Sequence, residues 1–344
     1  MLLTKSIRPL PSKWHGITDK EERFRRRYLD MTMNKEVLER FKRRALFWKA
    51  HRDFLDSRGF HEVNIPVLEH IPGGGDAVPF VTHMNAIDED FYLRISHELP
   101  LKRLIGGGFE KVYDIGARFR NEGLSDEHLP EHQAMEFYWA YADWKDGMEL
   151  IRELFTYILD TVYEGRRTFT IRGHQVDFSN DWEIIDFAGI MRDKYGIEDI
   201  YRPDLEQLKK LLTDNGIEFD PETVNSARAT DSLWKKLRKD ISGPAFLINH
   251  PKFLSPLQKP SEQNPLMVER FQPIIAGSEL VTAGVRSMTR LTSISALLSR
   301  CTCVNQVMTR RSGSTLIMSR CLNTVWHRHS DTVTANVYSG FWKT

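Results

Sequence analysis

The sequence has few cysteines, no long apolar run and almost no net charge. Its three cysteines, among 344 residues, all follow residue 300, so a disulfide framework is not expected without an export signal. The CxC pair Cys301 and Cys303 lacks the further ligands of a zinc site. No stretch approaches the ~20 apolar residues that cross a bilayer. A total of 48 basic and 47 acidic residues excludes a uniformly basic coat for nucleic acid but leaves a local basic groove open. These absences predict a soluble, cytoplasmic protein.

Acidic residues are nearly missing from the end of the chain. Asp331 is the single acid between Val281 and Thr344, where eight lysines and arginines stand. A nucleic-acid-binding arm is one interpretation of such a segment. However, arms of that kind are usually rich in lysine, and this segment has only Lys343. The change of composition at residue 281 therefore needs another explanation.

Hydrophobic periodicity predicts both helices and strands, and the strands at 111–120 and 133–143 are expected to form an antiparallel pair with a long loop. Residues 1–16 carry two prolines and are expected to form an entry arm, followed by the main domain over residues 17–280. Strands are expected at 61–68, 91–95, 111–120, 133–143, 245–251 and 269–280, with a hairpin within 164–181. Helices are expected at 19–31, 35–57, 97–105, 146–163 and, as a charged insertion, within about 185–245.

A charged constellation follows the strand at 111–120. Arg120 and Glu122 stand at the end of that strand, and His128 follows in a polar loop. An arginine and a carboxylate are therefore expected at the same edge of the sheet. The planar guanidinium suits two oxygens of one phosphate or carboxylate group. An ion pair at a loop edge is the simpler explanation for these residues taken alone. The triple glycine at 73–75 is by itself equally consistent with a turn.

Longer blocks of sequence resemble the class II aminoacyl-tRNA synthetases, and closely their lysine-specific branch. RFRNEGLSDEHLPEHQAMEFYWAYAD is similar to the second signature motif of that family, and GFHEVNIPVL to the first. Further similar blocks are PLPSKWHGITDKEERFRRRYLDM, IPGGGDAVPFVTHMNAIDEDFYLRISHELPLKRL and FLSPLQKP. The resemblance implies an α+β fold, in which an antiparallel sheet is flanked by helices, and a homodimer. It also implies a reaction, in which lysine and ATP form lysyl-adenylate with the help of Mg²⁺ and lysine then passes to its tRNA. It also implies an anticodon-binding barrel before Pro9, which this sequence does not contain.

The resemblance assigns roles to individual residues. Arg120 would bridge the α-phosphate and the substrate carboxylate, and Glu122 would orient the adenine amine or the amino acid. ATP would also contact His128 and His132. The resemblance implies that lysine is held by Gly74, Glu98, Glu136 and Tyr138, and that Mg²⁺ is held by Glu279. Two simpler alternatives stay open: Glu98 as an acid favoured at a helix N-terminus, and Tyr138 as a core aromatic.

Some positions depart from the family pattern. His132 stands where the family has an adenine-stacking phenylalanine, and Glu127 and Leu129 replace an arginine and an asparagine. Gln272 replaces the second metal-binding carboxylate, so one acid remains at that site. These departures bear on efficiency more than on identity.

The resemblance stops after Leu280. A lysine-pocket strand and a third motif, whose arginine clamps ATP, are both expected there and both missing; Arg286 stands where an acid should meet the lysine ammonium. Both motifs can be read in a shifted reading frame, in which each new codon combines the third base of one printed codon with the first two bases of the next. The residues from Val281 to just beyond Ile294 can then be read as NGWSEVNDPADQHQ, and Asp331–Lys343 as YGxGERLFWFLE. We therefore expect residues 281–344 to be an out-of-frame tail, with little adenylation and lost sheet strands if it is made as printed.

Three functions compete. The favoured one is a lysine–tRNA ligase. The first alternative is a related ligase that attaches lysine to the protein elongation factor P and lacks the anticodon barrel, although the PLPSKWHG arm resembles the joint to such a barrel. The second is a catalytically inactive, synthetase-like binding module, which the missing third motif favours and the retained Arg120, Glu122 and Glu98 oppose.

Overall fold

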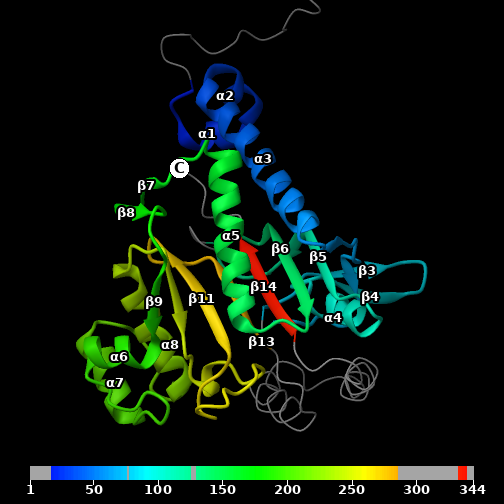
Figure 1. The fold of residues 1–344 in the computed structure, drawn as a ribbon. Helices are drawn as coiled ribbons and strands as arrows, with labels where there is room; N and C mark the ends of the chain where they lie inside the picture. Colours follow the sequence, from blue (N-terminus) through cyan, green and yellow to red (C-terminus); the bar gives the residue numbers. More distant parts are fainter. Residues whose placement is uncertain (1–16, 76, 125–128, 286–331, 339–344) are drawn as a thin grey trace, which may run out of the picture. The chain divides into compact units, whose positions relative to one another are not determined.

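The computed structural model describes residues 17–75, 77–124, 129–285 and 332–338 (Figure 1). These residues divide into two units. The first contains the described residues up to Leu55 together with Leu154–Arg166, and the second contains Asp56–Glu153 and the described residues from Arg167 on. In the described part of the chain, no helix has the length and apolarity needed to cross a membrane.

The first unit is helical. The helix predicted over 19–31 is two short helices, because the backbone turns out of helical geometry at Arg26. Buried Asp30 stabilises this break by accepting hydrogen bonds from Arg23, Arg27 and Asn34. The unit also contains most of α3, the long helix whose limits the sequence predicted as observed, and the end of a further helix, α5. The elements are α1 (Lys20–Arg25), α2 (Arg27–Met33), α3 (Lys35–Ser57) and α5 (Trp144–Val162).

The second unit is built on one mixed sheet of nine strands, in the order β1-β5-β6-β14-β13-β11-β10-β9 with β12 paired to β11. The pairs β1–β5 and β9–β10 are parallel and the others are antiparallel, which confirms the predicted fold class. The strands are β1 (His61–Glu62), β5 (Lys111–Phe119), β6 (Glu131–Ala140), β9 (Glu183–Asp186), β10 (Ala245–Ile248), β11 (Arg270–Ile275), β12 (Ser278–Glu279), β13 (Val281–Val285) and β14 (Thr332–Tyr338).

Smaller elements complete the unit. The strand predicted over 61–68 is divided: β1 joins the main sheet, and β2 joins a three-stranded sheet of β2 (Leu68–Glu69), β4 (Glu89–Leu93) and β3 (Val81–Met84). The predicted hairpin consists of β7 (Thr168–Ile171) and β8 (His174–Asp177). The helical segment predicted at 185–245 connects the parallel strands β9 and β10 and packs around its own apolar cluster. The helices are α4 (Glu98–Gly106), α6 (Phe187–Tyr195), α7 (Leu205–Asp214) and α8 (Ser226–Leu237), with short 3-10 turns at Arg238–Asp240 and Lys252–Leu254.

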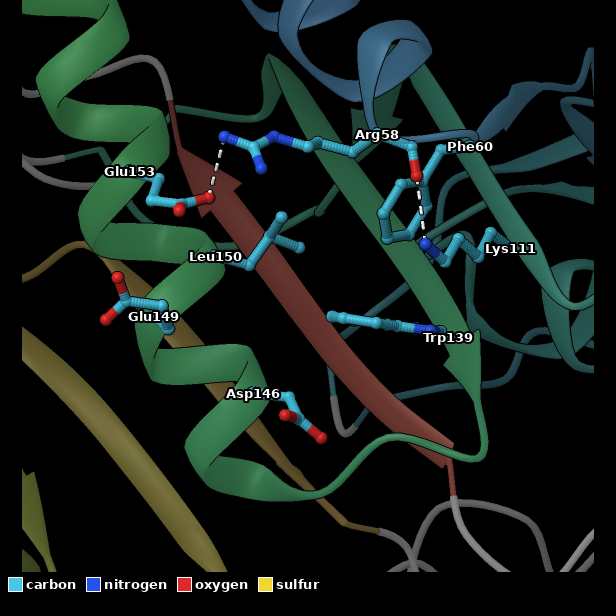
Figure 2. A pocket seen from close by; sticks show the side chains of 8 residues that line it. All are labelled: Arg58, Phe60, Lys111, Trp139, Asp146, Glu149, Leu150 and Glu153. Atoms are coloured by element: carbon cyan, nitrogen blue, oxygen red, sulfur yellow. Dashed lines mark hydrogen bonds and ion pairs between the residues drawn. The ribbon is translucent and has the colours of Figure 1, made fainter.

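The two faces of the main sheet bury different side chains of β6, because successive residues of a strand point to opposite sides. Tyr138 packs with Leu101 and Ile105 of α4. Trp139 lies on the other face, where its ring contacts Phe60 at a centroid distance of 5.8 Å. Figure 2 shows a cavity on this second face, between the strands and the first turns of α5. It is lined by Arg58, Phe60, Lys111, Trp139, Asp146, Glu149, Leu150 and Glu153.

Two segments of the tail continue the sheet. β13 pairs with β11 and β14, and β14 pairs with β6 over Thr332–Tyr338. The expectation that the printed tail loses strands from the sheet is therefore wrong for these segments. Strand pairing uses backbone groups that almost any residue supplies, and both segments are rich in valine or threonine, which favour strands. The other tail residues, including Arg286, lie outside the described residues.

Candidate functional site

The triple-glycine loop lies against the start of α4. Gly74 has a φ of 84°, and a Cβ atom there would lie 2.7 Å from Ser96 Oγ and 2.8 Å from Glu98 Cβ. Only glycine permits both this backbone conformation and this approach. The structure therefore brings together Gly74 and Glu98, two residues that the sequence assigned to one site.

Glu98 is the first residue of α4 and is buried. Its backbone N–H donates to Ser96 Oγ at 3.1 Å, and its carboxylate accepts a 2.6 Å bond from Lys102 Nζ, one turn along the helix. The helix dipole also favours an acid at this position. Glu98 thus has a structural role in α4, and a substrate ammonium would share its carboxylate with Lys102.

Glu136 of β6 also contacts Ser96. Its Oε1 accepts from Ser96 Oγ at 3.1 Å and from Arg118 Nη1 at 3.0 Å, and both charged side chains are 1% exposed. Burial raises the pKa of Glu136, the Arg118 charge opposes this rise, and the charge of Glu98 adds to it. Ser96 therefore links the two acids that the sequence predicted to bind lysine.

Tyr138 lies two residues further along β6 and points to the same side as Glu136. It is 2% exposed and belongs to an apolar cluster with Ile65, Leu101 and Ile105. The structure thus gives Tyr138 the packing of a core aromatic beside the acids. Its contact with a lysine side chain stays a prediction.

The end of β5 carries Arg120 and Glu122. The Nε of Arg120 is buried and has no hydrogen-bond partner in the described part of the chain, an arrangement that suits a bound anion. Glu122 is exposed, and its Oε1 lies 3.4 Å from the backbone nitrogen of Val78. Asn121 N–H donates to Val78 O at 2.7 Å. The chain that follows the triple glycine therefore runs beside Arg120 and Glu122.

Of the two predicted ATP-binding histidines, one can be described. His132 is half-buried at the start of β6, opposite Arg118 in the strand register, and its Nδ1 lies 3.2 Å from Leu129 O. His128 and Glu127 lie outside the described residues. The geometry of the outer-phosphate contact is therefore still a prediction.

A second buried ion pair lies beneath the site, and the sequence reasoning missed it. Arg94 donates to Ala117 O at 2.8 Å and to Asp114 Oδ2 at 3.1 Å, and His97 Nδ1 lies 3.3 Å from the same carboxylate oxygen. Burial and the charge of Arg94 lower the pKa of His97 to about 2, so this imidazole is neutral. A Cβ at Gly116 would collide with Arg94. The signal available in the sequence was the charged pair Asp114 and Arg118, which stand on the same side of β5 in an otherwise largely apolar strand.

Glu279 does not fit the Mg²⁺ role that the resemblance implied. Its Oε1 accepts from Trp234 Nε1 and its Oε2 from Gln272 Nε2, both at 2.7 Å, and Arg238 Nε lies 3.6 Å away. The described residues contain no group of three His, Cys, Asp or Glu side chains that could hold a metal ion. A hard cation needs several oxygen ligands, whereas Glu279 has donors around it. No step is derived through Mg²⁺ at this position.

The strand register relates this cluster to the acids. Glu136 is paired with Asn336, and Asn336 with Thr282, whose Oγ1 lies 3.5 Å from Gln272 Nε2. Adjacent strands are about 4.8 Å apart, so three strand spacings put Gln272 roughly 14 Å from Glu136 along one row of the sheet. Glu136 and Gln272 thus share a row of the sheet, and Gln272 carries the hydrogen bond to Glu279, the predicted metal residue, in a separate cluster.

Comparison with known proteins decides the family. The family model described as tRNA synthetases class II (D, K and N) matches residues 19–299. The chain belongs to the class II tRNA synthetases.

The relatives in this family include three bacterial proteins named lysine–tRNA ligase. Similarity to the Thermotoga maritima protein is 44% identity over 282 residues, or 82% of this chain and 55% of that protein. Similarity to the Fervidobacterium nodosum protein is 43% over 283 residues, with the same two coverages. The Roseiflexus sp. (strain RS-1) protein is 42% identical over 283 residues, or 82% of this chain and 58% of its own length. The chain therefore spans about half the length of the curated relatives it matches.

Proposed function

We propose that this chain contains the lysine-activating site of a lysine–tRNA ligase. Lysine and ATP would react there to give lysyl-adenylate and pyrophosphate, and lysine would then be transferred to tRNA(Lys). The observation that supports the proposal is the pair of buried acids, Glu98 and Glu136, next to the loop of Gly74. Ser96 Oγ accepts from the backbone N–H of Glu98 and donates to the carboxylate of Glu136. Lysine carries two ammonium groups, so a site for it needs carboxylates in this number and proximity.

Each residue would have a role in holding the two substrates. Glu98 would accept the α-ammonium of lysine, with Gly74 allowing close backbone approach, while Glu136 and Tyr138 would line its side chain. Arg120 would neutralise the lysine carboxylate and the α-phosphate that it attacks. Glu122 and His132 would hold the adenine. Reaction of two anions needs positioning and charge neutralisation and no protein nucleophile.

The state of the tail determines whether the printed chain is active. We infer that residues from Val281 on are read out of frame, because the shifted reading contains both missing motifs in the family order. The segment at 332–338, whose shifted reading contains the third motif, pairs with β6 directly beside the second motif. Sequencing the gene across codons 280–282 and measuring the intact mass of the protein test this. An unbroken frame that matches the printed sequence would refute it.

Lysine-dependent exchange of pyrophosphate into ATP tests the activity. We expect little exchange with the printed tail and clear exchange after the tail is restored to the shifted frame. Glu98→Gln in the restored chain should abolish the lysine-dependent exchange. Exchange with aspartate or asparagine in place of lysine would contradict the proposal. If the restored chain binds lysine and ATP without any exchange, the inactive binding module is the better description.

Partners and location follow from the same proposal. Aminoacylation of tRNA(Lys), against modification of elongation factor P, would separate the two ligase functions. We also propose a homodimer, which analytical ultracentrifugation tests. Lysine, ATP and tRNA meet in the cytoplasm, so the proposal assigns the chain to that compartment.

A further inference from the structure

Arg118 contacts Glu136, one of the two proposed lysine-binding acids. We propose that Arg118 is a positioning residue that keeps Glu136 ionised and correctly oriented for a cationic substrate side chain. This inference rests on the proposed function. It assigns to Arg118 an indirect role, exerted through Glu136, with no contact to lysine itself.

The geometry gives Arg118 a defined path to Glu136. The strand register places Asp114 directly opposite Glu136, and Arg118 opposite His132, so the guanidinium reaches diagonally across β5 and β6. Gly116 lies between Asp114 and Arg118 on the same side of β5, and the space beside it is taken by the guanidinium of Arg94. The resulting contact, Nη1 to Oε1 at 3.0 Å, is between two buried groups. This charged hydrogen bond and the one from Ser96 Oγ both hold Oε1 of Glu136.

The charges around Glu136 make this contact necessary for ionisation. Glu98 of α4 adds a like charge, and Asp114 stands opposite on β5, where it is itself paired with Arg94. Ser96 Oγ and the backbone of His97 donate hydrogen bonds, but they carry no charge to balance the carboxylate. In the described part of the chain, Arg118 supplies a cation in direct contact with Glu136. Without it, a carboxyl group buried to this extent takes up a proton and no longer attracts an ammonium group.

The test uses the full chain with its tail restored to the shifted frame, which serves below as the unmodified chain, and measures lysine binding by calorimetry between pH 6 and pH 9. Arg118→Met should bind lysine at least tenfold more weakly at pH 6–7, and its affinity should rise towards pH 9 as Glu136 ionises. The unmodified chain should show a much flatter profile. Arg118→Lys should restore part of the affinity. Arg152→Met, which removes a half-exposed arginine of α5 that pairs with Glu149, is the matched control and should change nothing.

Infrared spectroscopy gives a readout that does not depend on lysine. Arg118→Met should show the carbonyl band of a protonated, buried carboxyl group at pH 7, and the double variant Arg118→Met/Glu136→Gln should lack it. The double variant also removes both charges together, so it retains the fold if a lone buried carboxyl destabilises the single variant. Circular dichroism checks each fold.

The possible outcomes separate the inference from the function on which it rests. If Arg118→Met keeps the affinity and pH profile of the unmodified chain, or shows no protonated carboxyl band, the inference is overturned. If the unmodified chain fails to bind lysine, the proposed function is overturned, and the infrared comparison still decides whether Arg118 controls the charge of Glu136.

Discussion

The side-chain amide of Gln272 donates a 2.7 Å hydrogen bond to Oε2 of Glu279. Its own carbonyl oxygen lies 2.7 Å from His250 Nε2, and Trp234 donates to the other oxygen of Glu279. The Glu279 carboxylate thus accepts from two neutral donors, and the Arg238 guanidinium lies 3.6 Å away. A metal ion in the same place would need those oxygens, so the glutamine determines what Glu279 can bind.

Gln272→Glu should convert this cluster into a divalent-cation site. Two adjacent carboxylates repel each other, so the variant should melt at a lower temperature in EDTA than the unmodified chain. Mn²⁺ or Mg²⁺ should raise its melting temperature, and at 100 times the Kd the gain is about 2.7 kcal/mol. The control Gln263→Glu adds the same charge at an exposed position. Calorimetry that shows no cation-dependent shift in the Gln272 variant would contradict this account of the cluster.

Lys102→Met should tighten lysine binding. Lys102 Nζ lies 2.6 Å from Glu98 Oε1 and competes there with the proposed substrate ammonium. Removing one charged hydrogen bond of this kind should improve lysine binding by about 1 kcal/mol, roughly fivefold. The control is Lys111→Met, because Lys111 lies on the opposite face of the sheet, beside Trp139 (Figure 2). Weaker binding by the Lys102 variant in titration calorimetry would show that this lysine supports the site.

Gly74→Ala should abolish lysine binding and destabilise the loop. The added Cβ would meet Ser96 and Glu98 below 3.0 Å, and the residue would stay at a positive φ. A strained backbone position of this type costs on the order of 1–3 kcal/mol. Gly75→Ala is the matched control, since its Cβ would make only an ordinary contact of 3.9 Å with Ile95. Equal lysine affinity in both variants would argue against a close approach of this loop to the substrate.

Glu69→Gln should stabilise the protein at alkaline pH and have little effect at acidic pH. Burial raises the pKa of Glu69 to about 7, although Arg94 and Arg103 lower it. The folded state therefore favours the protonated acid, a contribution that is complete below about pH 4.5 and lost as the pH rises through 7.

A glutamine at position 69 imitates the neutral acid at every pH. Because Glu69 is partly exposed, the expected gain at pH 8 is about 1 to 2 kcal/mol. Thermal melts at pH 5 and pH 8 measure it, with Glu110→Gln as an exposed control. A gain of the same size at both pH values would mean that the carboxyl charge is not the cause.

Sequence patterns were sufficient where a local rule dominates. The limits of α3 were predicted as observed, and β5 and β6 were predicted as an antiparallel pair, because helical periodicity and strand alternation act over a few neighbouring residues. The predictions failed where distant residues decide. The strand at 61–68 is divided between two sheets, because its two ends pair with different distant strands. The break of the helix at Arg26 is a local exception: buried Asp30 accepts hydrogen bonds from Arg23, Arg27 and Asn34, and helical periodicity does not report such side-chain contacts.

The candidate site shows the same division. Arg120, Glu122, Glu98 and Glu136 were selected from sequence blocks, yet nothing in the sequence indicated that Arg118 pairs with Glu136 or that Ser96 links Glu136 to Glu98. Those contacts join residues up to 40 positions apart. They depend on strand register and on the space left by glycine, which composition does not report.

By itself, the sequence determined the family, the set of candidate site residues and the break in the pattern after Leu280, because these are properties of residue type and order. Tertiary structure alone decided which partner each charged group has. Burial makes an unpaired charge costly, so packing forces a choice of partner: Arg118 for Glu136, Lys102 for Glu98, and Gln272 with Trp234 for Glu279.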